Sequence, residues 1–136
     1  MINEASLKRK FKNEAEKLGW LVTIIEQKSS SGTPDLVLGK DRKWVWIECK
    51  HWELPRTVLD KRNVKIAPHL FTRAKVQYET MRRLASAGPA YYVVFVTDGL
   101  GFVGSSIVGP NGIHLGADTF SVLSNKEILQ DLENMI

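Results

Sequence analysis

Two acidic residues and one lysine stand in two neighbouring predicted strands, and their types are those needed to hold a metal ion. Asp35 follows a proline at the start of one strand, and Glu48 and Lys50 lie near the end of the next, Lys43–His51. Because side chains alternate between the two faces of a strand, Glu48 and Lys50 point to the same side. A hairpin can therefore bring Asp35 and Glu48 within reach of one cation.

Magnesium in proteins prefers oxygen ligands, commonly one or two carboxylates with water and a substrate phosphate. The backbone carbonyl of Cys49 is available as a further ligand. Lys50 beside such an ion can orient water and offset charge on a phosphate, so the pattern predicts metal-assisted phosphodiester hydrolysis. Each motif alone is also common in turns and at strand ends, and only their combination indicates catalysis.

A third acid comes from the predicted first helix, which runs from an Asn3 cap to about Leu18, before Gly19. Glu4 lies on the side of its apolar stripe, and an acid in a first turn also complements the helix dipole. Glu14 falls near the same stripe one turn from the helix end, so helix geometry leaves both acids open.

The pattern along the chain predicts one α/β domain over residues 1–136, with elements in the order αβββαββα around a mixed central β-sheet flanked by helices. The second helix starts at a Thr72 cap, and the last at a capping box of Ser124 and Glu127. The segment Glu53–Phe71 has no clear assignment. The predicted strands are Trp20–Lys28, Leu36–Leu38, Lys43–His51, Tyr91–Thr97 and Gly101–Val108.

Composition narrows the class of partner and the compartment. The net charge of +4 and the pI near 9.3 favour a polyanion such as nucleic acid. A single cysteine, Cys49, excludes an internal disulfide and a multi-cysteine zinc site, and we expect it to be a small buried hydrophobic residue. The sequence has neither a membrane-length apolar run nor a secretory signal, so we expect a soluble, cytoplasmic protein with no membrane partner.

Several side chains are candidates for DNA contact, although cations on helices are usually just solvated. They are Lys8, Arg9 and Lys12 on the first helix, Arg73 and Lys75 at the second, and Ser30 and Ser31 in the loop before Asp35. The three histidines, His51, His69 and His114, have no spacing that indicates a zinc site or a triad. Trp44 and Trp46 share the face of Glu48, where packing against a helix is the expected role.

The ordered segments "EASLKRKF", "SGTPD", "IECK", "FTRAKVQ" and "AGPAYYVV" resemble the VRR-type nuclease domain of the PD-(D/E)xK superfamily, especially its stand-alone phage versions. The resemblance implies a restriction-endonuclease-like core in which Asp35, Glu48 and Lys50 are catalytic and Glu4 is the helical metal ligand. It also implies a catalytic role for Gln77, which opens the second helix and can hydrogen-bond Lys50 or a phosphate, although a glutamine on a helix is usually solvated. It also implies dependence on Mg²⁺ or Mn²⁺ and activity on DNA, in some members on branched junctions. Archaeal Holliday junction resolvases have a similar order of residues, whereas the segment 53–71 is an enlarged insertion.

The leading hypothesis is therefore a Mg²⁺-dependent DNA endonuclease, selective for a structure such as a junction or flap, located in the host cytoplasm if phage-encoded. Symmetric cutting of two strands needs two active sites, which predicts a homodimer. The alternatives are a non-catalytic nucleic-acid-binding module on the same fold, a sequence-nonspecific or restriction-type nuclease, and a small assembly protein. One-metal and two-metal mechanisms both remain open.

Overall fold

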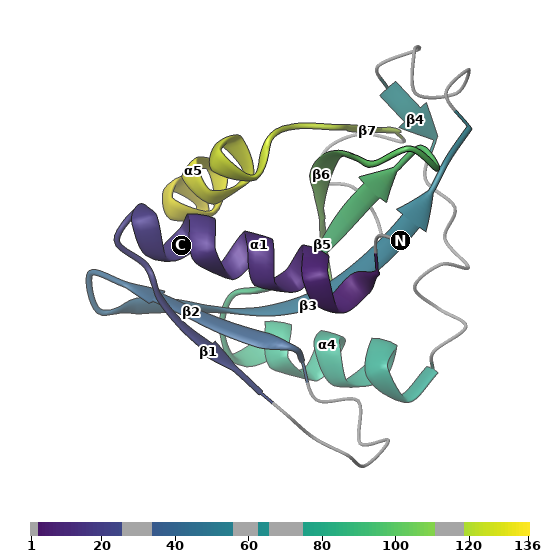
Figure 1. Ribbon diagram of the computed structural model, residues 1–136. Helices are drawn as coiled ribbons and strands as arrows, with labels where there is room; N and C mark the ends of the chain where they lie inside the picture. Colours follow the sequence, from purple (N-terminus) through teal and green to yellow (C-terminus); the bar gives the residue numbers. More distant parts are fainter. Residues whose placement is uncertain (1–2, 26–33, 56–62, 66–74, 111–118) are drawn as a thin grey trace.

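A five-stranded mixed sheet forms the centre of the molecule (Figure 1). The computed structural model describes residues 3–25, 34–55, 63–65, 75–110 and 119–136. The strand order is β1-β2-β3-β5-β6, in which β3 and β5 are parallel and the other neighbours antiparallel. The strands are β1 (Leu21–Ile24), β2 (Leu36–Lys40), β3 (Lys43–Glu53), β5 (Ala90–Thr97) and β6 (Phe102–Val108).

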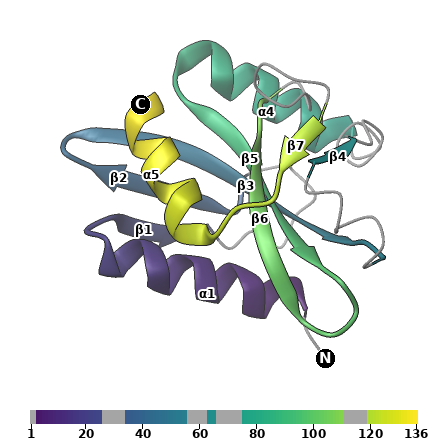
Figure 2. The ribbon, with the colours of Figure 1, turned by 90° about the horizontal axis from the view of Figure 1, so that it is seen from above.

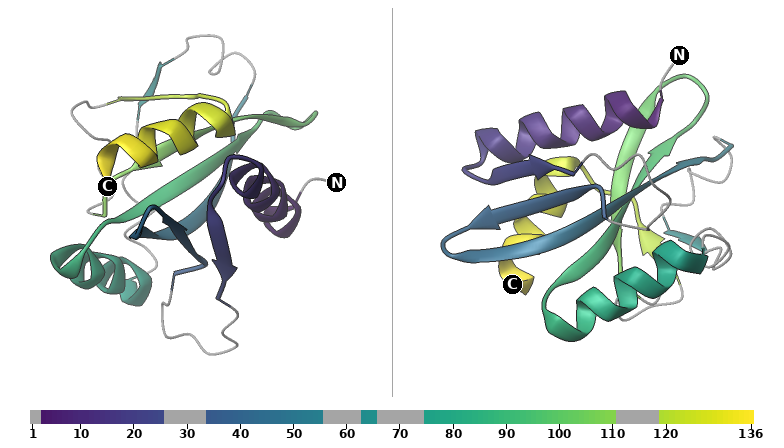
Figure 3. Two further views of the ribbon diagram at one scale, coloured as in Figure 1. Left: turned by 90° about the vertical axis from the view of Figure 1, so that its left-hand side faces the viewer. Right: turned by 90° about the horizontal axis from the view of Figure 1, so that it is seen from below.

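Helices cover both faces of this sheet. Helices α1 (Glu4–Lys17) and α5 (Asn125–Met135) lie side by side over one face, as the view from above shows (Figure 2). Helix α4 (Lys75–Ala87) lies on the opposite face, along β5 (Figure 3). It forms part of the connection between the parallel strands β3 and β5, which cannot be joined by a tight turn.

The helix ends follow the predicted capping chemistry. The side chain of Asn3 accepts the N–H of Ser6 at 2.8 Å, and the Ser6 side chain reaches back to complete a capping box for α1. Gly19, just past the end of α1, has φ +91°, a conformation that favours glycine. At α5 the predicted capping box of Ser124 and Glu127 is also confirmed.

A two-residue turn joins β2 to β3, where the sequence predicted a hairpin, and β2 extends two residues beyond its predicted end at Leu38. Asp41 and Arg42 both have positive φ, 52° and 66°, and connect the paired residues Lys40 and Lys43. Two successive left-handed residues give the twist that antiparallel strands require. The turn fixes the register, so that Leu36 pairs with Ile47.

The two faces of the sheet carry separate cores. Residues of β3 alternate between them: Val45, Ile47 and Cys49 lie among the side chains beneath α1 and α5, and Trp46 packs with the cluster beneath α4. The prediction that Cys49 is a buried hydrophobic residue is confirmed. The first cluster also includes Leu7, Phe11, Leu36, Leu38, Phe95 and Leu129, and the second Met81, Tyr92, Val94 and Val96.

The main order of elements is the predicted αβββαββα, with differences in detail. The strand β3 extends to Glu53, two residues beyond its predicted end, because β5 continues to pair with it. Two short strands, β4 (Asn63–Lys65) and β7 (Thr119–Ser121), form an additional antiparallel pair that was not predicted. The proposed Thr72 cap and the end of the first predicted strand lie outside the described residues.

The expectation that Trp44 packs against a helix is wrong, since its side chain is 70% exposed. Helix α4 packs along β5, and the start of β3, near the β2–β3 turn, is not covered by it. Trp46, two residues further along β3, is partly buried and contacts the second core cluster, as expected. Among the described residues, no helix combines the length and the apolar character required to cross a membrane.

Candidate active site

The candidate residues meet where β2 separates from β3. Pairing between these strands runs from Lys40↔Lys43 to Leu36↔Ile47, whereas β3 continues to Glu53 beside β5. Asp35 lies at this fork, and its Oδ2 atom accepts the backbone N–H of Cys49 at 2.9 Å. The carboxylate of Asp35 thereby takes the place of the next backbone hydrogen bond between β2 and β3 and is held beside Glu48.

Glu48 is an acid in a buried position, with only 3% of its surface exposed. Its Oε1 atom is buried and has no hydrogen-bond partner among the described residues. Burial, followed by the neighbouring charge of Asp35, raises the pKa of Glu48 to about 9. Burying the ionised carboxylate with an unused oxygen is costly, so this carboxyl either holds a proton or binds a cation.

Lys50 lies on the same face as Glu48, as strand alternation predicted. Its Nζ atom is 3.9 Å from Oε2 of Glu48 and donates a hydrogen bond to Oε1 of Gln77. Gln77 belongs to α4, so the second helix positions the lysine of the third strand. The structure thus brings together Asp35, Glu48, Lys50 and Gln77.

Helix α1 reaches the same site from the other face. Lys8 forms an ion pair with Asp35, at 3.0 Å from Nζ to Oδ1. Glu4, one turn earlier, lies close enough to Asp35 for the two charges to interact. Partial burial and the charge of Asp35 raise the pKa of Glu4.

Between the two helical acids that the sequence left open, the structure brings Glu4 to the site. Glu14 lies further along α1, where its Oε1 is 3.6 Å from Lys10 and accepts a long hydrogen bond of 3.5 Å from Asn125 of α5. Its contacts tie the two helices together and are away from Asp35.

The donor set fits a hard divalent cation. Asp35 and Glu48 are adjacent carboxyls, and Oε1 of Glu48 has no hydrogen-bond partner among the described residues. The ammonium of Lys8 forms an ion pair with Asp35, so a positive charge already lies beside this carboxylate. Within the described ranges, no three His, Cys, Asp or Glu side chains are grouped closely enough to hold a metal by themselves. Magnesium can use only one or two carboxylates with water and phosphate, so this set suffices. The carbonyl of Cys49 stays a predicted ligand.

Among the described residues, the other predicted DNA contacts, Arg9, Lys12 and Lys75, form no hydrogen bond or ion pair with this site. Lys12 pairs with Glu16 on α1 at 3.4 Å, and Arg9 lines a surface depression with Lys10 and Asn13. Lys75 is exposed at the start of α4. Ser30, Ser31 and Arg73 lie outside the described residues.

Two neighbours of the site had no assigned role in the sequence. His51 is near enough to Glu4 to affect its pKa, and its Nε2 lies 2.7 Å from Oγ1 of Thr97. Tyr92 is the β5 partner of Glu48, and burial, followed by the charge of Glu48, raises the pKa of Tyr92. Strand alternation from Cys49 could have placed His51 on the α1 side of the sheet. Tyr92 could not be found in this way, because the pairing of β3 with β5 joins residues distant in the sequence.

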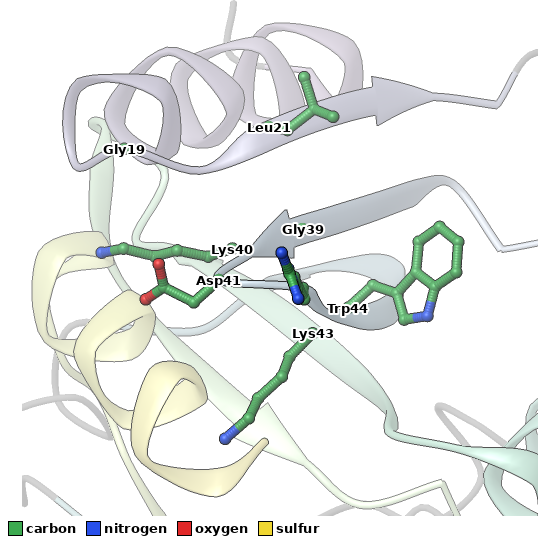
Figure 4. Close-up of a pocket in the computed structure, with 8 residues that line it drawn as sticks. Gly19, Leu21, Gly39, Lys40, Asp41, Lys43 and Trp44 are labelled. Carbon is green, nitrogen blue, oxygen red and sulfur yellow. The ribbon is translucent and has the colours of Figure 1, made fainter.

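A surface depression of about 420 Å³ lies at the other end of β3, near the β2–β3 turn (Figure 4). Leu21, Gly39 and Trp44 are neighbours in a row across three strands there. Lys40 and Lys43, which also line it, extend away from Trp44. Lys40 donates to the carbonyl of Leu18 and pairs with Glu133, and Lys43 donates to the carbonyl of Ile136. This depression is separate from the carboxyl cluster.

The mixed sheet, with α1 and α5 on one face and α4 on the other, is a restriction-endonuclease-like α/β fold, as the sequence predicted. Among solved structures, the chain is similar to Hjc of Archaeoglobus fulgidus, a Holliday junction resolvase from an archaeal hyperthermophile. The TM-score is 0.56 and the identity 16%, over 92% of this chain and 98% of that chain. At this identity the similarity concerns the fold.

No family model and no curated protein matches the chain. The resemblance to VRR-type nucleases therefore stays a prediction from the motifs.

Proposed function

We propose that the protein is a metal-dependent endonuclease that hydrolyses DNA phosphodiester bonds at branched structures. The observation that carries this proposal is the cluster at the β2–β3 fork, where Asp35, the buried Glu48 and Lys50 come from two paired strands. Two adjacent acids and a lysine, one acid of which is buried with an unused carboxyl oxygen, have little structural purpose in the absence of a bound cation.

Asp35 and Glu48 would hold Mg²⁺ or Mn²⁺, with Glu4 approaching from α1. When bound, the ion would stabilise negative charge on the phosphate and lower the pKa of a water molecule. Lys50 is the catalytic cation of this chain: it lies beside Glu48, and its ammonium can hold the attacking water against the phosphate. Gln77 is a positioning residue, because it accepts a hydrogen bond from Lys50.

The preference for branched DNA rests on the likeness in fold to a Holliday junction resolvase. Symmetric cuts in a junction need two active sites, so we propose a homodimer. A cytoplasmic location fits such an enzyme and stays a prediction.

The test uses a labelled four-way junction, a flap and linear duplex, each with Mg²⁺, Mn²⁺ or EDTA. We expect paired cuts in the branched substrates alone. Cleavage should be lost in EDTA and in the variants Asp35→Asn and Glu48→Gln. Cutting of linear duplex at an equal rate would replace the structure-selective proposal with a general nuclease. Tight junction binding without cleavage under any divalent ion would indicate a binding module instead.

A further inference from the structure

The ion pair between Lys8 and Asp35 occupies an oxygen that the proposed metal site needs. We infer that Lys8 is a built-in cation that neutralises Asp35 in the metal-free protein and competes with a divalent ion for Oδ1. This inference rests on the proposed function, because it concerns the same carboxyl cluster, and it makes Lys8 a determinant of metal affinity.

Both oxygens of Asp35 are already engaged. Oδ2 accepts the N–H of Cys49 at 2.9 Å, and Oδ1 accepts Nζ of Lys8 at 3.0 Å. The first contact is part of the sheet and fixes the orientation of the carboxylate. The second is made by a side chain, so it is the contact that a metal ion can replace.

Lys8 and a metal ion cannot share Oδ1 without a cost. Divalent ions of this kind bind carboxylate oxygen at about 2.1 Å. An ion on Oδ1 would therefore lie close to the ammonium of Lys8, which is 3.0 Å from the same oxygen. Two positive charges so close repel strongly in a partly buried site. Lys8 must therefore move away from Oδ1 when the ion arrives.

The side chain of Lys8 can move away from Asp35 into solvent. Lys8 is 22% exposed and extends from the outer helix α1 on a flexible stem, so its ammonium can turn to solvent. Lys50 differs in this respect, because Gln77 holds it and its distance to Glu48 is 3.9 Å. Of these two lysines, Lys8 is the one bonded to Asp35.

Lys10 offers a matched control. It lies on the same helix and also pairs with an acid, Glu14, at 3.6 Å, but that acid is outside the carboxyl cluster. Lys10→Met thus removes the same charge and one ion pair without touching Asp35. Any general effect of net charge on metal binding would appear equally in both variants.

The experiment measures Mn²⁺ binding to the DNA-free protein by electron paramagnetic resonance of the free ion. We expect Lys8→Met to bind Mn²⁺ about tenfold more tightly than the native chain, with Lys10→Met unchanged. Lys8→Gln, which retains a hydrogen-bond donor without the charge, should also bind more tightly. Circular dichroism checks that each variant is folded. If Lys8→Met does not fold, the Mn²⁺ affinity of Lys8→Gln tests the inference in its place.

The outcomes separate the inference from the proposed function. If the native chain binds Mn²⁺ and Asp35→Asn does not, the metal site stands, and equal or weaker binding by the Lys8 variants would overturn the role of Lys8 alone. Binding by the Lys8 variants but not by the native chain would support it in its strongest form. If no form binds Mn²⁺, both the site and the role of Lys8 are wrong.

Discussion

The Oδ2 atom of Asp35 lies 2.9 Å from the backbone nitrogen of Cys49 and accepts its hydrogen bond, although Asp35 is outside the paired part of β2. One carboxylate therefore completes the sheet and belongs to the candidate metal site. The stability of the fold and the chemistry of the site are coupled through this residue.

The first prediction separates these two roles. In Asp35→Asn the amide oxygen can still accept the Cys49 N–H, whereas Asp35→Ala leaves that buried donor without a partner. We expect Asp35→Ala to be less stable than Asp35→Asn by about 1–3 kcal/mol in urea unfolding. Both variants should lack cleavage. Equal stability of the two would show that the hydrogen bond contributes nothing to the fold.

The second prediction concerns pH. The pKa of Glu48 is about 9 in the folded protein and 4.5 in an ordinary environment, so between these values the folded state holds a proton that the unfolded state has released. Its contribution to stability is full below pH 4.5 and declines as pH rises towards 9.

As pH rises from 4.5 towards 9 in EDTA, the free energy of unfolding of the native chain should therefore fall relative to that of Glu48→Gln. The fall should be up to about 1.4 kcal/mol per pH unit. Urea unfolding of both proteins at pH 5.5, 7 and 8.5 measures this difference. Glu79→Gln, an exposed acid on α4, should follow the native chain at every pH. A difference between Glu48→Gln and the native chain that is constant with pH would contradict the raised pKa.

The third prediction tests how Lys50 is positioned. Gln77→Leu removes the acceptor for its ammonium and keeps a side chain of similar size on α4. We expect the single-turnover cleavage rate to fall by about 10- to 100-fold, since small displacements of a catalytic group have effects of this order. Junction affinity in EDTA should remain within about threefold. A lost affinity with an unchanged rate would instead make Gln77 a DNA contact.

The fourth prediction concerns the fold alone. A Cβ atom added at Gly104 of β6 would lie 2.6 Å from Cγ1 of Val122 and 2.7 Å from the carbonyl oxygen of Leu123. Gly104→Ala should lower stability by about 1–3 kcal/mol, because backbone must move. At Gly88 the same addition meets nothing within 4 Å, so Gly88→Ala should be tolerated. Thermal unfolding of both variants checks the contrast.

Local signals predicted the elements that have local causes. The caps at Asn3 and Ser124, the left-handed stop at Gly19 and the β2–β3 turn all depend on neighbouring residues, and all are confirmed. The strands β4 and β7 could not be predicted, because each has three residues and pairs with a partner distant in the chain. Pairing of this kind depends on tertiary context.

The site shows the same division. Strand alternation placed Glu48 and Lys50 on one side correctly, but periodicity within α1 could not choose between Glu4 and Glu14. That choice depends on which end of α1 lies over the β2–β3 fork, a fact of packing. Trp44 was assigned to the core for a related reason, since alternation identifies a face and does not show how far α4 extends over it.

The parallel pairing of β3 with β5 has a consequence for the order of folding. The β2–β3 hairpin closes over a two-residue turn, so Asp35 and Glu48 can meet early and at little cost in chain entropy. Lys50 gains its contact with Gln77 only when α4 docks beside β5, an event between residues distant in sequence. We therefore expect the acidic half of the site to assemble before the half that would make it reactive.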